Sequence, residues 1–276
     1  MSWAKTFRST FKASLLTQFR AYTLSGWTIS AILSPVFLFM GAWVVLRFLT
    51  NGANPSGFFA LTGYPSYLAF VVLGVAFNGL ASSALEDGGN AIYDEESNGT
   101  WDVLSLAPFN RFVWIFAKTL AGLVTGFVDF FAVLLLGFVA FRFAPTWGGL
   151  AIALVGIAIT IVALQGFGYF MAAVGLRWKQ PYAIAFLLSP VVILVSGMMF
   201  PITVLPGWAQ WISNAIPLTH GLTIVRDAIL VNRGLVDLLP VFLRLIASGA
   251  AFMAIGYGAF IVMEKKAREA GVLGRY

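Results

Sequence analysis

The chain has 276 residues, of which 60% are hydrophobic and only 10% are charged. An ordinary soluble domain is about 45–50% apolar and about 25% charged, so this composition excludes a soluble enzyme, a disordered chain and a fibrous repeat. It indicates a polytopic membrane protein. The absence of cysteine and the single histidine exclude a disulfide scaffold, a thiol nucleophile and a multi-histidine metal site. The net charge of +6 fits a positive inner membrane face, and we expect no nucleic-acid partner.

The first 24 residues predict an amphipathic helix that lies in the inner membrane interface. Five apolar side chains recur every four residues and form one stripe, namely Trp3, Phe7, Phe11, Leu15 and Phe19. Lys5, Lys12 and Arg20 fall on another face, where they can meet anionic membrane lipid. The alternative is a cytoplasmic extension of the first membrane span.

Six later segments are long and apolar enough to cross a membrane as helices, because lipid leaves no partner for an unpaired backbone group. They cover residues 27–49, 64–85, 112–141, 147–176, 181–200 and 238–263. The fold class is therefore all-α, with a six-helix transmembrane domain over residues 25–276. With the N-terminus inside, 12 of the 17 Lys and Arg residues lie on the inner side. We expect a multi-pass inner (plasma) membrane protein with cytoplasmic termini and a tail at 264–276.

Residues 86–110, expected as an inner loop, hold six of the 11 acidic residues. Thr100 follows a glycine turn and can cap a short helix. Trp101 and Leu104 give that helix an apolar side, which suits a groove on a partner protein. The alternative is a solvated acidic linker.

Residues 201–234 are too long for a hairpin and too apolar for a solvated loop, so we expect short re-entrant helices in the outer leaflet. His220 in this segment is a candidate pH sensor or, more simply, a bridge within the outer turn. Asp129 is the only carboxylate deep in the third span, and an acid there is a functional hypothesis by default. As a functional residue Asp129 could line a substrate path or bind a cation. As a structural residue it could lie near an outer vestibule or bond to Thr125 or to a partner helix.

The ordered set of these features resembles the type-2 ABC (ATP-binding cassette) export permease family. The inner loop carries the family's acid, Gly-Thr, acid, Leu and Pro pattern at Glu95, Glu96, Gly99, Thr100, Trp101, Asp102, Leu104 and Pro108. Ser97 departs from it, since many members carry an acid there. The element before the last span is matched by Pro217, Leu218, Thr219, His220 and Arg226. Thr223 departs from this second motif, where an acid is common.

The resemblance implies a permease that pairs with a second permease subunit, expected as a homodimer, and with two nucleotide-binding ATPase subunits. The inner loop would be the coupling helix, and the turn with Arg177 and Lys179 a second contact. The chain lacks the G-x-x-x-x-G-K-S/T phosphate loop. We therefore expect no enzyme and no bound cofactor here, with ATP and Mg held by the partner. Gly166-Phe167-Gly168 is better explained by close helix packing.

Sparse intramembrane charge and an apolar outer segment favour export of an amphipathic cargo, such as a lipid-linked glycan, a lipid or a hydrophobic drug. One alternative is an ATP-independent, proton-coupled secondary transporter that uses Asp129. That class is expected to show inverted repeats and several intramembrane ionisable groups. A membrane enzyme is a third hypothesis, but it needs a polar catalytic cluster that one histidine does not supply.

Overall fold

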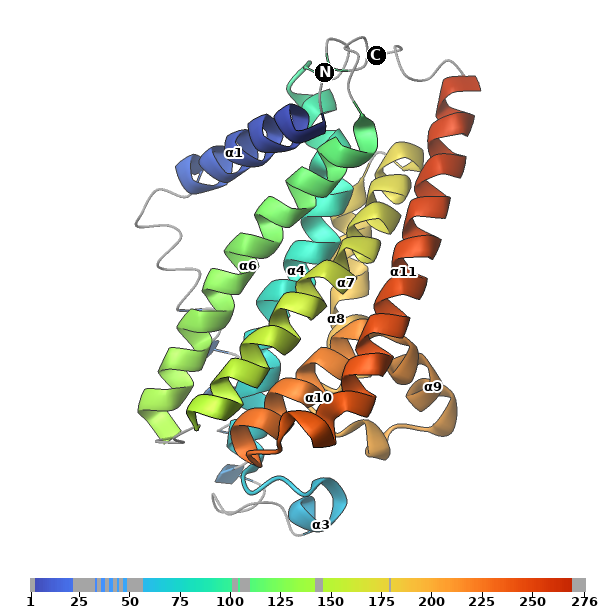
Figure 1. Cartoon of the computed structure of the whole chain (residues 1–276). Coiled ribbons are helices and arrows are strands. Elements are labelled where there is room, and N and C mark those ends of the chain that lie inside the picture. Colours follow the sequence, from blue (N-terminus) through green and yellow to red (C-terminus); the bar gives the residue numbers. More distant parts are fainter. Residues whose placement is uncertain are drawn as a thin grey trace.

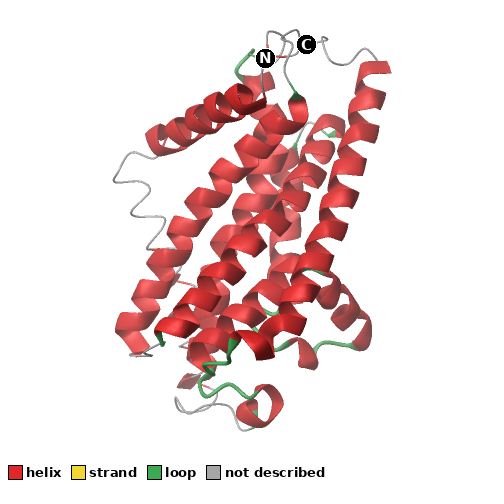
Figure 2. Cartoon of the chain, viewed as in Figure 1, coloured by secondary structure: helices red, strands yellow, loops and turns green. Residues whose placement is uncertain are grey.

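The structure is a computed structural model that describes residues 3–21, 57–100, 104, 110–141, 146–178 and 180–269, with single positions between 33 and 48. This part of the chain is helical and contains no strand, which confirms the all-α class (Figure 2). Its elements are α1 Trp3–Ala21, α3 Phe58–Thr62, α4 Tyr67–Ser97, α6 Arg111–Phe141, α7 Trp147–Arg177, α8 Pro181–Val195, the 3-10 helix η1 Ile202–Val204, α9 Gly207–Ala215, α10 Pro217–Leu230 and α11 Leu235–Glu269.

The long helices α4, α6, α7 and α11 run side by side; α4, α7 and α11 point in one direction and α6 in the other (Figure 1). Helix α1 lies across α6 at the end of the bundle where α4 and α11 finish, and α9 and α10 lie at the opposite end (Figure 1). An ion pair of 3.0 Å between Arg111 Nη1 and Glu264 Oε1 joins the start of α6 to the end of α11. Helix α1 and the C-terminal end of α11 lie toward the same end of the bundle (Figure 1), and the side of the membrane that this end faces stays a prediction.

Four described helices, α4, α6, α7 and α11, are long and apolar enough to cross a membrane, and α8 is a shorter apolar helix of 15 residues. The predicted spans at 112–141, 147–176 and 238–263 lie inside α6, α7 and α11, respectively. The predicted span at 27–49 lies almost wholly outside the described residues. The count of six spans therefore stays a prediction.

Helix α4 runs 12 residues beyond the expected end of the second span at 85, so the expectation of a loop from 86 onward was wrong. The helix continues because its C-terminal half is packed and its acidic side chains have partners. Gly88 packs directly on the backbone of Gly168 in α7. A Cβ atom on residue 88 would lie 2.3 Å from the carbonyl oxygen of Gly168. The connection between α4 and α6 therefore covers only residues 98–110.

Helix α4 is the most enclosed of the long helices and forms much of the main hydrophobic core. Helix α7 packs against both α4 and α11. The two glycines of Gly166-Phe167-Gly168 serve these two contacts, since Gly166 meets the backbone of Phe252 on α11 and Gly168 meets α4. The helix-packing interpretation of this sequence is confirmed.

The fifth predicted span, at 181–200, is shorter in the structure, because α8 ends at Val195 in a turn with Gly197 at φ 78°. The expected short helices follow as η1, α9 and α10 before α11. Helix α10 packs against α7, α11 and α4, and nearly all of its residues are buried. Whether α9 and α10 dip into a membrane stays a prediction.

Candidate coupling site

The end of α4 is closed by a well-formed C-cap. Gly99 adopts φ 68°, and its N–H donates to the Glu96 carbonyl at 3.0 Å. The N–H of Thr100 donates to the Glu95 carbonyl at 2.9 Å. These two bonds with a left-handed glycine form the Schellman motif. The glycine that the sequence places before Thr100 therefore redirects the chain out of α4 into the proposed coupling segment.

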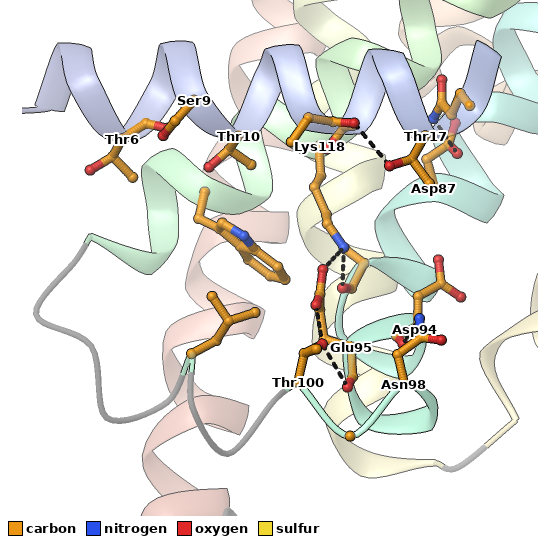
Figure 3. A pocket seen from close by; sticks show the side chains of 17 residues that line it. Thr6, Ser9, Thr10, Thr17, Asp87, Asp94, Glu95, Asn98, Thr100 and Lys118 are labelled. Carbon is orange, nitrogen blue, oxygen red and sulfur yellow. Dashed lines mark hydrogen bonds and ion pairs between the residues drawn. The ribbon is translucent and has the colours of Figure 1, made fainter. Parts of the chain in front are cut away.

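Glu95 holds the start of this segment against α6. Its carboxylate receives a 2.6 Å bond from Lys118 Nζ on α6 and a second bond from the Thr100 hydroxyl. The bonds from Lys118 and Thr100 both reach the Glu95 carboxylate and stabilise its charged form. Lys118 also donates to the Ala91 carbonyl at 3.0 Å and lies over the Trp114 ring. One carboxylate thus ties the loop to both long helices (Figure 3).

The described part of the coupling loop continues this contact. The N–H of Leu104 donates to the Thr100 carbonyl at 3.0 Å, which is one helical turn. The Leu104 side chain packs on the cluster that contains Ile92, Trp114 and Ile115. Of the other residues predicted for this site, Glu96 lies in the last turn of α4. Trp101, Asp102 and Pro108 lie outside the described residues.

The second predicted contact, the turn between α7 and α8, lies at the same end of the bundle (Figure 1). Arg177 in the last turn of α7 is exposed, and Lys179 lies outside the described residues. Tyr182 on α8 hydrogen-bonds to Asp94 on α4, and its ring meets that of Tyr93 edge-on at 6.0 Å. The start of α8 is therefore attached to the end of α4, so the two predicted contacts are physically connected.

A cavity of about 930 Å³ lies between α1 and the ends of α4 and α6 (Figure 3). Its wall on α4 carries Asp87, Asp94, Glu95 and Asn98, and α6 contributes Lys118. Gln18 of α1 joins the three helices, because its Nε2 donates to Asp87 Oδ1 at 3.3 Å and its Oε1 accepts from Thr125 on α6. Helix α1 is thus tied by polar bonds to the helices that carry the coupling loop.

Arg226 on α10 is buried at the opposite end of the bundle and binds three backbone carbonyls. Its guanidinium donates to Phe70 on α4 and to Gly197 and Met198 in the turn after α8, each at 2.8 Å. It also lies 3.3 Å from the centroid of the Phe70 ring. The arginine therefore satisfies carbonyls that the end of α8 leaves unpaired, and it joins three helices.

The neighbouring Asp227 forms its own network, pointing away from that of Arg226. It accepts from the Tyr64 hydroxyl and from Arg233 Nη1, both at 2.8 Å. Burial and the Asp227 charge together raise the pKa of Tyr64. His220 Nε2 lies 2.8 Å from the Asn214 carbonyl and joins α10 to α9, in line with the bridging role expected of it.

The remaining residues of this predicted element fill the start of α10. Pro217 occupies the first helical turn, where its missing N–H has no partner to lose. Leu218 and Thr219 are buried beside it, and the Thr219 hydroxyl has no hydrogen-bond partner in the part of the chain that the structure describes. The structure therefore gathers the whole motif onto one enclosed helix.

Asp129 lies on α6 against Gly79 of α4. Its Oδ1 is buried and has no hydrogen-bond partner among the described residues. The hydroxyl of Thr125, one alternative partner, instead donates to the Gly122 carbonyl and to Gln18. No hydrogen bond joins Asp129 to the Glu95 or the Arg226 network among the described residues, and its role stays a prediction.

Comparison with known proteins identifies the family. The sequence profile described as ABC-2 type transporter matches residues 6–230, which is most of the chain. The chain belongs to this family. The match includes α1, the loop 98–110 and α10, so it spans both the Glu95 network and the Arg226 network.

Several characterised or named permeases are similar to this ABC-2 family member. It is 26% identical over 181 residues to the inner membrane transport permease YhhJ of Escherichia coli K12, covering 64% of this chain and 48% of the relative. It is 27% identical over 168 residues to the linearmycin resistance permease protein LnrN of Bacillus subtilis, covering 61% and 43%. The probable multidrug ABC transporter permease YbhR of Escherichia coli K12 is 26% identical over 141 residues, covering 51% and 38%. The aligned region spans about half or less of each relative.

Several residues of these networks were not among the predicted site residues, and four of them carry most of the contacts. Lys118 entered the sequence argument only as an inner positive charge, and Asp87 only as one of several acids. Gln18 and Tyr64 carried no motif at all. A basic residue seven positions into a span is the one signal that pointed to Lys118, because a charge at that depth requires a partner.

Proposed function

We propose that this ABC-2 permease is the membrane subunit of an exporter driven by separate nucleotide-binding ATPase subunits. Two copies of the chain would pair in the membrane, each engaged by one ATPase subunit at the loop 98–110 and the turn 178–180. The ATPase would bind and hydrolyse ATP with Mg, and the permease would move an amphipathic cargo outward. The cytoplasmic side of the membrane would then face the α1 end of the bundle.

The observation that carries this proposal is the double attachment of α4. At one end Glu95 ties the loop and α6 to it, and at the other end its Phe70 carbonyl is held by Arg226. Between these points lie 24 residues of unbroken, mostly buried helix. A displacement of the loop would therefore be transmitted along a rigid helix to α8 and α10, as a two-state coupling mechanism requires.

The cargo class rests on the described surface. Large apolar side chains are exposed along α8 and α9, among them Phe186, Leu187, Trp208 and Trp211. Such faces suit lipid, a second permease copy or an amphipathic molecule, and they do not suit a small hydrophilic solute. The names of the relatives, which include a multidrug permease and an antibiotic-resistance permease, support a hydrophobic or amphipathic cargo.

The test is purification of the tagged chain from its own membranes in mild detergent, with identification of its partners and an ATPase assay. We expect a stoichiometric ATPase subunit whose hydrolysis depends on this chain. A preparation that preserves other membrane complexes but contains no ATPase would overturn the proposal and favour the proton-coupled alternative.

Two substitutions locate the contact. Trp101→Asp or Leu104→Asp should weaken ATPase association and transport, because each places a charge on the apolar side of the coupling segment. Leu61→Asp is the matched control, since Leu61 is exposed on α3 at the opposite end of the bundle. Size-exclusion elution at the wild-type volume shows that the variants are folded. Unchanged association in folded variants would refute the coupling-helix assignment.

The orientation is tested by thiol labelling, because the chain contains no native cysteine. A cysteine at Val236, at the α10 end, should react with an impermeant reagent added outside. A cysteine at Ser97, at the end of α4, should react only after the membrane is permeabilised. The reverse pattern would contradict a cytoplasmic coupling loop.

A further inference from the structure

Helix α1 turns a row of hydroxyl groups toward the bundle. Thr6, Ser9, Thr10, Ser14 and Thr17 all line the cavity between α1, α4 and α6. Thr6 is only 4% exposed, so its side chain is enclosed between α1 and the bundle. Figure 3 shows these hydroxyl-bearing side chains on the side of α1 that faces α4 and α6. The Ser9 and Thr17 hydroxyls donate to carbonyls of α1 itself, and the face as a whole remains suited to polar contents.

The opposite wall supplies acceptors and almost no free donors. Asp87, Asp94 and Glu95 bring three carboxyl groups to the cavity, and Lys118 is the single basic residue among its lining residues. That ammonium group is already used, since it contacts the Glu95 carboxylate, the Ala91 carbonyl and an aromatic ring. The cavity therefore has an excess of hydrogen-bond acceptors, which favours a ligand rich in N–H and O–H donors.

The lining also has an apolar part. Ala13, Ala91, Leu104 and Trp114 complete the wall beside the coupling loop. A volume of about 930 Å³ is within the range of about 300–1,000 Å³ that is usual for small-molecule sites. A ligand that fills this space needs a polar, donor-rich head and an apolar remainder, and α1 lies where such an amphiphile would leave a membrane surface.

We propose that this cavity binds the primary ammonium head of an amphiphile, with Asp94 and Asp87 as charge partners and the Thr6 row of α1 as hydroxyl contacts. The proposal rests on the proposed function, because it places the ammonium-bearing group of the cargo, or of an aminolipid, beside the coupling loop. Occupancy would alter the surroundings of Glu95 and Lys118, and thereby the position of the loop. The cavity would thus report the presence of a ligand to the ATPase.

The experiment uses the full chain in nanodiscs of phosphatidylcholine, a lipid that carries no primary amine. The probe is a long-chain primary amine with a diazirine, compared with the alcohol and the carboxylic acid of the same chain length. Photolysis followed by peptide mass spectrometry locates the adducts. We expect the amine to label peptides from α1 and the end of α4, the alcohol to label them less, and the acid not at all. Equal labelling by all three probes, or amine adducts only elsewhere, would overturn the proposal.

Substitutions test the assigned contacts. Asp94→Asn should weaken half-maximal amine labelling on the order of tenfold, the effect of losing one hydrogen bond to a charged group. Thr6→Val should weaken it less, and Asp237→Asn on α11 is the matched carboxylate control, expected to be unchanged. Asp87→Asn tests the same carboxyl contacts by the same amine labelling if Asp94→Asn does not fold. Wild-type affinity in folded Asp94→Asn and Asp87→Asn variants would refute the charge assignment.

A last arm separates the source of the ammonium group and the two proposals. Competition by added phosphatidylethanolamine would identify an aminolipid as an occupant, whereas amine labelling that resists it would point to the cargo. ATPase association is measured on the same preparations. Selective amine labelling without ATPase association would defeat the proposed function alone, and normal association with unselective labelling would defeat the ammonium site alone.

Discussion

Removal of the Arg226 guanidinium should destabilise the bundle more than any other single charge deletion considered for this chain. In Arg226→Met the side chain keeps its approximate length, but the carbonyls of Gly197 and Met198 lose their donors, and the Phe70 carbonyl keeps only its bond within α4. Each buried acceptor that is left unpaired costs about 1–3 kcal/mol. Removal of the buried charge itself offsets part of this cost. The expected loss in the free energy of unfolding is therefore about 3–5 kcal/mol.

The effect should depend on the shape of the cation as well as its charge. Arg226→Lys keeps one positive charge, but a single ammonium group does not span the carbonyls of α4 and of the turn after α8. We expect the free energy of unfolding of this variant to fall by roughly 2 kcal/mol, about half of the loss expected for Arg226→Met. The measurement is the free energy of unfolding by SDS titration in mixed micelles, with helical circular dichroism as the signal.

The control is Arg244→Met, which removes an exposed arginine from α11. A surface change of this kind is expected to stay within about 0.5 kcal/mol of wild type. A loss of less than about 1 kcal/mol in the free energy of unfolding of Arg226→Met would be below the cost of one unpaired buried carbonyl. That result would refute the stabilising role assigned to the bonds between Arg226 and the backbone carbonyls.

Three further predictions concern the coupling end and the intramembrane acid. Lys118→Glu should free the loop and increase its cleavage by protease, and the exchange with Glu95→Lys in the same chain should restore much of the protection; no restoration would contradict a direct ion pair. Asp129→Asn should reduce export in vesicles while assembly on native gels is unchanged if the acid serves transport, and normal export would assign it a structural role. Gly99→Val should cost about 1–2 kcal/mol through strain at positive φ and raise loop cleavage, whereas Gly148→Ala, with an open site and ordinary φ, should change neither.

The sequence by itself determined the fold class and the helices that cross the bundle. Hydropathy is a local property, so the segment predicted at 147–176 appears as α7 to within one residue. Close packing at Gly166 and Gly168 was also predictable, because paired small residues in a span have few other uses. The glycine turn before Thr100 was readable for the same reason, since a left-handed C-cap is a requirement of the backbone alone.

Only the tertiary structure decided where the coupling loop begins and what holds it. The acids after residue 85 read as a loop, yet Asp87, Asp94 and Glu95 remain helical because Gln18, Tyr182 and Lys118 meet them from other helices. The same holds at the opposite end, where Arg226 binds carbonyls 28 to 156 residues away in the chain. Hydropathy records the cost of a buried charge but not the identity of its partner, and that identity is set by which helices pack together.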